Sequence, residues 1–354
     1  MQEGQPVSQS IDREAIKRIV VLRLDRVGDL ILSTPFFKNL REGFPQAHIA
    51  VVVTPYTEEV IKGDSAIDEL LVYDGDSPLR DQYDFLKKLG SQNWDLAIAL
   101  SPISMAYLFT YFTRAPLRYG CAYSRRWISR FIARLLLTYV KVFSIDEALK
   151  RHEKIPHEVE QMLSLLQDMG METNDYGLSI SVHDDELAAA KATLGEWIVG
   201  KRLIGVHLSW KWLTDSWTAE DFCEFARALL ARYSESYLLL TYGPLEYDLA
   251  SSISGLLKGE EQILLQGNLS FKRWAGLIAQ CDLFFSPDTG ALHCATALGI
   301  PVVGVYEARS FEHCSQQWAP WKVPHVIVKK GNPEETIDEL LAGGEKLINT
   351  GRMS

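Results

Sequence analysis

Short, almost wholly apolar segments alternate with helical segments along the whole of this chain. In the first half they are Ile19–Leu24, His48–Val53 and Leu96–Leu100, and the pattern restarts later with Leu203–Val206 and Tyr237–Thr241. Continuous apolar strands are typical of parallel sheets that helices cover on both faces. The alternation therefore predicts an α/β fold with doubly wound parallel sheets.

The length of the chain predicts two domains, because 354 residues exceed the size of one typical domain. The polar, turn-rich stretch Met171–Gly177 is the best linker. We therefore predict one Rossmann-like domain over residues 1–172 and a second over residues 173–354. The amphipathic helix predicted at Pro333–Ile348 either stays with the second domain or packs back on the first.

Charge and cysteine content narrow the function classes. A formal net charge of −10 argues against a general nucleic-acid binder. Five cysteines without CxxC spacing indicate neither a disulfide framework nor a zinc site, and they favour a reducing compartment. Residues 2–9 are polar, unlike a signal peptide, and no apolar run reaches the roughly 18 residues that span a bilayer. We expect a cytoplasmic protein, either free or resting on the cytoplasmic face of the inner membrane.

A turn late in the chain has the features of an anion site. An apolar run ends at Pro287, Asp288-Thr289-Gly290 follows, and a helix of small residues begins with His293 in its first turn. Exposed amides and the helix dipole attract anions at such a place, and a glycine lets a ligand approach the backbone. The alternative is an ordinary capped helix with a structural histidine.

A second turn of this kind follows the first strand. Ile19–Leu24 runs into Asp25–Asp29 and then into a helical segment. Ligands in open α/β sheets bind at the carboxyl ends of the strands, so Asp29 is placed to face a binding cleft. The alternative role of Asp29 is that of a carboxylate that caps the helix.

Neither half carries a Gly-x-Gly-x-x-Gly fingerprint after its first strand, which argues against a dinucleotide redox enzyme. The chain instead resembles the ADP-heptose:lipopolysaccharide heptosyltransferase family (glycosyltransferase family 9), over Arg18 to Val328. The similarity rests on the shared order and spacing of several motifs. The matching segments are Ile19–Pro35, Phe44-Pro45, His157-Glu158-Val159, Asn268-Leu269-Ser270, Asp288-Thr289-Gly290 with His293, Gly299-Ile300-Pro301 and Trp318-Ala319-Pro320.

The resemblance implies two facing Rossmann-like domains of the GT-B type with a cleft between them. Family members transfer heptose from ADP-heptose to the inner core of lipopolysaccharide, invert the anomeric centre and need no bound metal or cofactor. The N-terminal domain would bind an anionic glycolipid acceptor, and the C-terminal domain would bind the nucleotide sugar. By position, Asp29 matches the catalytic base. The residues that match the diphosphate-binding turn are Asp288, Thr289, Gly290 and His293.

The resemblance also implies contacts with the nucleoside. Glu246 would hold the ribose, because a carboxylate only accepts hydrogen bonds and so suits two vicinal hydroxyls. It could equally be an exposed acid early in a helix. Asn268 and Leu269 would lie near the base, mainly through their backbones.

One segment departs from the family pattern. The usual Lys-x-Trp-Pro follows the first strand of the second domain, but here that stretch is Ser209–Thr218, and Asp215 stands at the Lys position if Trp217 aligns with the family Trp. A carboxylate beside a diphosphate is repulsive, so we expect Ser209 and Lys211 to serve the donor site. Otherwise the donor differs from ADP-heptose or the enzyme is impaired.

The acceptor contacts are expected to be basic. No acidic residue occurs between Asp95 and Asp146, and Arg126, Arg130 and Arg134 follow one another at helical spacing. A basic, aromatic-bearing helix favours contact of the Arg125–Arg134 region with a membrane surface or an anionic glycolipid. The alternative is a helix on the sheet with solvated arginines. As acceptor contacts near the cleft we predict Arg26, Arg114 and Arg118.

Two rival functions stay open. The protein could be a family member that uses another nucleotide sugar or another acceptor glycan, which the departure at Asp215 favours. It could also be a non-catalytic sugar-nucleotide-binding protein on the same scaffold. The presence of Asp29 together with the Asp288-Thr289-Gly290 turn argues against the second rival.

Overall fold

A computed structural model describes residues 11–195 and 199–351, with side chains as far as residue 349. The polar residues 2–9 lie outside the described residues. The chain divides into two compact units, and the division falls between Leu178 and Ser179. This division directly follows the turn-rich stretch Met171–Gly177.

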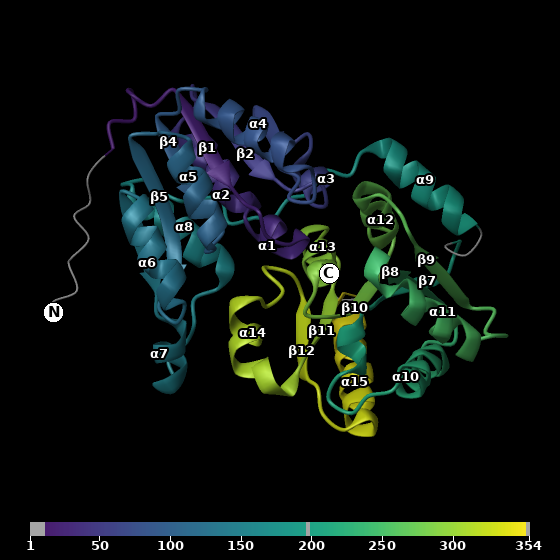
Figure 1. The fold of residues 1–354 in the computed structure, drawn as a ribbon. Coiled ribbons are helices and arrows are strands. Elements are labelled where there is room, and N and C mark those ends of the chain that lie inside the picture. The colour runs from purple at the N-terminus through teal and green to yellow at the C-terminus, as the bar shows by residue number, and fades with distance from the viewer. Residues whose placement is uncertain (1–10, 196–198, 352–354) are drawn as a thin grey trace. The chain divides into compact units, whose positions relative to one another are not determined.

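The first unit is built around a six-stranded parallel sheet in the order β3-β2-β1-β4-β5-β6 (Figure 1). Its elements are β1 (Arg18–Leu22), α1 (Val27–Leu32), α2 (Thr34–Gly43), β2 (His48–Val53), α3 (Glu58–Ile61), β3 (Glu69–Val72), α4 (Leu79–Gly90), β4 (Leu96–Ala99), α5 (Ser104–Phe112), β5 (Leu117–Tyr123), α6 (Trp127–Leu136), β6 (Tyr139–Phe143), α7 (Ile145–Lys150) and α8 (Glu158–Asp168). Strands β1, β2 and β4 are almost wholly buried, as the continuous apolar runs predict.

The second unit contains another six-stranded parallel sheet, in the order β12-β11-β10-β7-β8-β9. Its elements are α9 (Asp184–Leu194), β7 (Arg202–Leu208), the 3-10 turn η2 (Trp210–Leu213), α10 (Ala219–Arg232), β8 (Ser236–Tyr242), η3 (Pro244–Glu246), α11 (Tyr247–Leu256), β9 (Ile263–Gly267), α12 (Phe271–Ile278), β10 (Leu283–Pro287), α13 (Gly290–Ala297), β11 (Val302–Tyr306), η4 (Ala308–Ser310), α14 (Phe311–Gln317), β12 (His325–Lys329) and α15 (Pro333–Gly351).

Both sheets have the same connectivity. If each sheet's strands are counted from its own start, the order in both is third, second, first, fourth, fifth, sixth. The chain reverses direction across the sheet between the first and fourth strands, and ligands of doubly wound folds bind beside this switch point. The prediction of doubly wound parallel sheets is confirmed. The switch points lie between β1 and β4 in the first unit and between β7 and β10 in the second.

The core of the second unit is rich in aromatic rings. Trp212 packs its ring against Phe222 and Phe225, and Phe225 packs in turn against Phe285 of β10. Gly205 of β7 is required beside β10, since a Cβ there would lie 2.3 Å from the Phe284 ring. These contacts hold β7 and β10 together beneath the switch point.

The last helix, α15, packs on β10, β11, β12 and α10 of the second unit. This helix is therefore part of the second unit. Its buried residues Ile337, Leu340 and Leu347 belong to the second unit's apolar core. Among the described residues, no helix is both long enough and apolar enough to cross a bilayer.

Candidate functional site

Asp29 lies at the switch point of the first unit, in the first turn of α1. Arg26 is the N-cap residue of this helix, and the Asp29 carboxylate accepts a hydrogen bond from the backbone N–H of Arg26. Asp29 is therefore not the N-cap residue, as the alternative role required, although its carboxylate binds the N-cap N–H as the third helical residue of a capping box does. The Asp29 side chain is still 27% exposed, which leaves a carboxylate oxygen open to a ligand.

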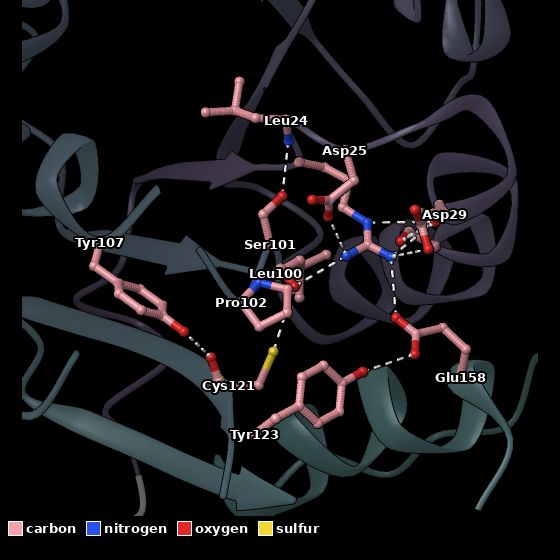
Figure 2. Close-up of polar contacts among 12 residues, drawn as sticks. Leu24, Asp25, Asp29, Leu100, Ser101, Pro102, Tyr107, Cys121, Tyr123 and Glu158 are labelled. Atoms are coloured by element: carbon pink, nitrogen blue, oxygen red, sulfur yellow. Dashed lines mark hydrogen bonds and ion pairs between the residues drawn. The ribbon is translucent and has the colours of Figure 1, made fainter. Parts of the chain in front are cut away.

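A buried arginine organises three carboxylates around this turn (Figure 2). The Arg23 guanidinium is 1% exposed and lies 2.8 Å from Asp25 Oδ2, 3.1 Å from Glu158 Oε1 and 3.9 Å from Asp29 Oδ1. It also donates to the backbone carbonyls of Asp29 and Leu100, each at 3.0 Å. Because Arg23 binds both the carbonyl and the carboxylate of Asp29, it fixes the orientation of the first turn of α1.

The surroundings of Asp29 raise its pKa to about 6. Burial is the largest cause, and the negative charges of Glu158 and Asp25 add to it, while Arg23 opposes the shift. One guanidinium cannot balance three carboxylates, so the site favours a proton on Asp29 more than water does. A carboxylate whose pKa lies near the working pH is suited to act as a general base.

The network extends from Glu158 to the neighbouring strands. Glu158 is buried at the first position of α8, and its Oε2 accepts a hydrogen bond from the Tyr123 hydroxyl at 3.2 Å (Figure 2). Arg126 lies over the Tyr123 ring and donates to the carbonyl of Pro102 at 3.2 Å. Arg23 just after β1, Tyr123 at the end of β5 and Glu158 at the start of α8 therefore meet at the carboxyl ends of the strands.

At the switch point of the second unit, a cation lies beside the start of a helix. Lys211, in the turn after β7, binds Asp288 through its ammonium group, which contacts the carbonyl oxygen and lies 3.2 Å from Oδ2. The hydroxyl of Ser209 accepts a hydrogen bond from the Lys211 N–H at 3.3 Å and so holds the turn. The structure thus brings together Ser209, Lys211 and Asp288, from the ends of β7 and β10.

Helix α13 begins beside this cation without a side-chain cap. Its N-cap residue is Thr289, whose hydroxyl lies 3.1 Å from the Ser286 hydroxyl instead of capping the helix. His293 is 4% exposed, and its buried Nδ1 has no hydrogen-bond partner among the described residues. Burial lowers the pKa of His293 to about 4, Lys211 adds to this shift, and Asp288 opposes it. Uncapped amides, an ammonium group and an unsatisfied imidazole nitrogen are groups suited to binding an anion.

The residues predicted to contact the nucleoside lie, like Lys211, at the carboxyl ends of the strands of the second sheet. Glu246 ends η3 just after β8, and burial raises the pKa of its carboxyl group. Asn268 follows β9 with a left-handed backbone (φ +54°), and Leu269 comes next. Strands β7, β8 and β9 are parallel neighbours, so all three residues follow carboxyl ends on the Lys211 side of the switch point.

Comparison with known proteins identifies the family. Residues 82–339 match the model of glycosyltransferase family 9 (heptosyltransferase). The chain belongs to glycosyltransferase family 9. It is therefore a glycosyltransferase.

Relatives and solved structures agree with this assignment over most of the chain. The lipopolysaccharide core heptosyltransferase OpsX of Haemophilus influenzae is 22% identical over 299 residues, which cover 83% of this chain and 80% of that protein. The crystal structure of a family 9 glycosyltransferase from Veillonella parvula matches with a TM-score of 0.77 at 20% identity, over 94% of this chain and 97% of that one. The Escherichia coli ADP-heptose lipopolysaccharide heptosyltransferase II structure matches with a TM-score of 0.74 at 18% identity, over 95% and 99%. These likenesses show the GT-B fold.

The structure accounts for the departure from the family at Asp215. Asp215 has a left-handed backbone (φ +53°), and its Oδ2 accepts a hydrogen bond from the Ala308 N–H at 3.2 Å. It therefore anchors the loop before α14. Lys211, four residues earlier, is the cation that reaches the start of α13.

Sequence reasoning missed Lys330, which supports the turn of Lys211. The side chain is 2% exposed, and its ammonium donates to the carbonyls of Lys211, Trp212 and Thr214 at 2.6–2.8 Å. Burial lowers its pKa to about 8, although Asp215 and Glu307 oppose the shift. The only sequence signal was a lysine after an apolar run, which does not reveal partners 116 to 119 positions away.

The predicted place of Arg114 and Arg118 near the site is wrong. Arg114 precedes β5 and Arg118 is its second residue, and parallel β5 and β1 both have their carboxyl ends on the Asp29 side. The two arginines therefore lie at the amino-terminal ends of the strands, whereas Asp29 follows the carboxyl end of β1. The guanidinium of Arg118 donates to Leu136 and Ala115 carbonyls at 2.8 and 2.6 Å, and Arg114 is exposed. Arg26, which is also exposed, does lie on the Asp29 edge.

Proposed function

We propose that this glycosyltransferase transfers a heptose from ADP-heptose to the inner core of lipopolysaccharide, with inversion and without a bound metal. Two similar proteins support the substrates: one is a lipopolysaccharide core heptosyltransferase and the other an ADP-heptose lipopolysaccharide heptosyltransferase. The observation that carries the mechanism is Asp29, an open carboxylate with a pKa of about 6 at a topological switch point.

In the proposed reaction, the Asp29 carboxylate takes the proton of the acceptor hydroxyl as that oxygen attacks the anomeric carbon. A new C–O bond forms while the bond from the anomeric carbon to the diphosphate breaks, and ADP leaves with the electron pair. A single displacement from the opposite side inverts the anomeric centre. General-base catalysis of this kind contributes roughly 10²- to 10⁴-fold to a rate.

The leaving diphosphate requires stabilisation of its negative charge, for which the second unit has suitable groups. Uncapped amides at the start of α13, the Lys211 ammonium and an N–H of neutral His293 would supply it. These donors supply cationic and dipolar stabilisation without a metal ion. Glu246 would bind the ribose, and Asn268 with Leu269 would contact the base through backbone groups.

The proposal also sets the compartment. Its acceptor is a lipid-linked sugar, so we place the enzyme in the cytoplasm, at the surface of the inner membrane.

Calorimetry with ADP, UDP and GDP tests the donor class. We expect ADP to bind most tightly, and transfer from ADP-heptose to a heptose-deficient core oligosaccharide to depend on Asp29. Tighter binding of UDP or GDP would shift the assignment to a family member with another donor. Nucleotide binding without turnover on any sugar donor would favour the non-catalytic alternative.

A further inference from the structure

Helix α6 presents its apolar side to solvent. Trp127, Ile128, Phe131 and Leu135 are 69%, 55%, 67% and 71% exposed, whereas Ala133 is the one fully buried residue of the helix. At about 100° per residue, the four exposed side chains fall within a single stripe about 100° wide. An amphipathic helix of a globular domain normally turns such a stripe inward. Here the stripe faces outward.

Helix α5, which packs against α6, extends this apolar surface. Eight of the sixteen large apolar side chains that are exposed in the described chain lie on these two helices. The ones on α5 are Met105, Leu108, Tyr111 and Phe112. We call these four residues and the four on α6 the α5–α6 surface. Exposed apolar patches of this kind mark places where a partner or a membrane binds.

Basic residues border the α5–α6 surface. On the helical wheel, Arg130 and Arg134 lie directly beside the apolar stripe of α6, and neither forms a salt bridge with a described residue. Arg125 and Arg126 stand just before the helix, and Arg125 lies 3.6 Å from Asp146. No acidic residue occurs between Asp95 and Asp146, although the whole chain carries a net charge of −10. The positive charge is therefore concentrated where the apolar side chains are exposed.

The α5–α6 surface begins at the carboxyl ends of the strands, which is also where Asp29 lies. The N-terminal ends of α5 and α6 follow the carboxyl ends of β4 and β5, and β4 pairs with β1 beside the Asp29 turn. Both helices then run back towards the opposite edge. A flat partner that covers the α5–α6 surface would thus extend to the carboxyl ends of the strands, where Asp29 lies.

We propose that the α5–α6 surface docks on a lipid bilayer that carries anionic headgroups. Exposed Trp, Phe, Leu and Ile would enter the boundary between headgroups and acyl chains, while the bordering arginines would bind lipid phosphates. The proposal rests on the proposed function for its purpose, which is to bring Asp29 to a lipid-anchored acceptor. The charge sign selects the bilayer over a second copy of this chain, because two identical arginine-bordered surfaces repel each other.

Vesicle cosedimentation of the full chain tests the proposal. We expect the wild type to bind vesicles of phosphatidylcholine mixed with phosphatidylglycerol, and to bind pure phosphatidylcholine about tenfold more weakly. The double variant Phe131→Ser/Leu135→Ser should lose about tenfold or more of the binding, because two inserted side chains are removed. The matched control is Leu79→Ser/Tyr83→Ser on α4, whose side chains are 83% and 66% exposed and lie outside the surface. This control should bind like the wild type.

Two further double variants separate the electrostatic contribution to vesicle binding from the apolar one. Arg130→Gln/Arg134→Gln should weaken binding to the anionic vesicles and flatten its salt dependence, whereas Lys87→Gln/Lys88→Gln on α4 removes the same charge elsewhere and should change neither. The proposal is overturned if the wild type ignores anionic vesicles at low salt, or if Phe131→Ser/Leu135→Ser binds them normally. It is also overturned if sedimentation velocity shows a wild-type dimer that this variant abolishes while vesicle binding persists.

A soluble acceptor keeps this test apart from that of the proposed function. Transfer to lipid-free core oligosaccharide should be unchanged in Phe131→Ser/Leu135→Ser, and only transfer to the lipid-linked acceptor in vesicles should fall. Absence of transfer to either acceptor by the wild type would refute the proposed function and leave the vesicle result intact.

Discussion

The two units have the same strand order but opposite chemistry at their switch points. In the first unit, the turn after β1 gathers Asp25, Asp29 and Glu158 around buried Arg23. In the second, the turn after β7 brings Lys211 to the uncapped start of α13. The shared topology decides where a site lies, and the few residues in the turns decide whether it attracts a proton or an anion.

The largest expected effect is a loss of turnover at the first switch point without a loss of ADP binding at the second. Asp29→Asn should lower turnover by roughly 10²- to 10⁴-fold, because the amide cannot take the acceptor proton. ADP binding, measured by calorimetry, should stay within twofold, as roughly expected for a site on the other unit. If Asp29→Asn lost affinity for ADP and kept its turnover, the assignment of proton transfer to the turn after β1 and of ADP binding to the turn after β7 would be wrong.

Lys211→Met tests the opposite half of the comparison. A charged hydrogen bond contributes roughly 1.5–3 kcal/mol, so ADP affinity should fall by about tenfold or more. Lys258→Met, at an exposed position of the same unit, is the matched control and should bind ADP normally. Equal affinities for the two variants would remove Lys211 from the anion site.

The raised pKa of Asp29 predicts a gain in stability on substitution. The pKa of Asp29 in the folded state, about 6, exceeds its ordinary value of 3.8, so ionised Asp29 destabilises the folded state above pH 6. Asp29→Asn should then raise the free energy of unfolding by on the order of 1–3 kcal/mol at pH 8, and the gain should vanish below about pH 4. Thermal melts over this pH range measure it. A variant that is less stable than the wild type at pH 8 would contradict the net repulsion around Asp29.

The smallest expected effect concerns Glu158, which we assign as a positioning residue. Because its negative charge helps to raise the pKa of Asp29, Glu158→Gln should move the acid limb of the kcat/KM profile to lower pH. Tyr123→Phe removes the hydrogen bond to Glu158 and keeps the charge, so this control should leave the limb near pH 6. A purely structural role for Glu158 would lower activity at every pH and leave the limb in place.

The sequence predicted the strands that are buried on both faces but missed β6 and β12, each at one end of its sheet. Continuous apolar runs revealed β1, β2 and β4, but β6 mixes Lys141 with aromatic residues and is half-buried throughout. β12 is similarly mixed, and both strands lie at the end of their sheets, where burial no longer dictates an apolar pattern.

The motifs located Asp29 and Asp288 beside their helices but did not show which residues support them. Arg23 looked like an interruption of an apolar strand, and its partner Glu158 lies 135 positions away. Arg114 and Arg118 were misplaced because the sequence alone did not say at which end of β5 they lie. Local patterns report turns and periods, whereas supporting contacts depend on which strands become neighbours.

One guanidinium serving three carboxylates has a consequence for the timing of catalysis. Before the acceptor arrives, the pocket around Arg23 holds more negative charge than its cation can neutralise. When a proton reaches Asp29, that excess is relieved. In the proposed mechanism, the excess of carboxylates that destabilises the folded state would therefore favour transfer of the acceptor proton to Asp29, and solvent would remove that proton between turnovers.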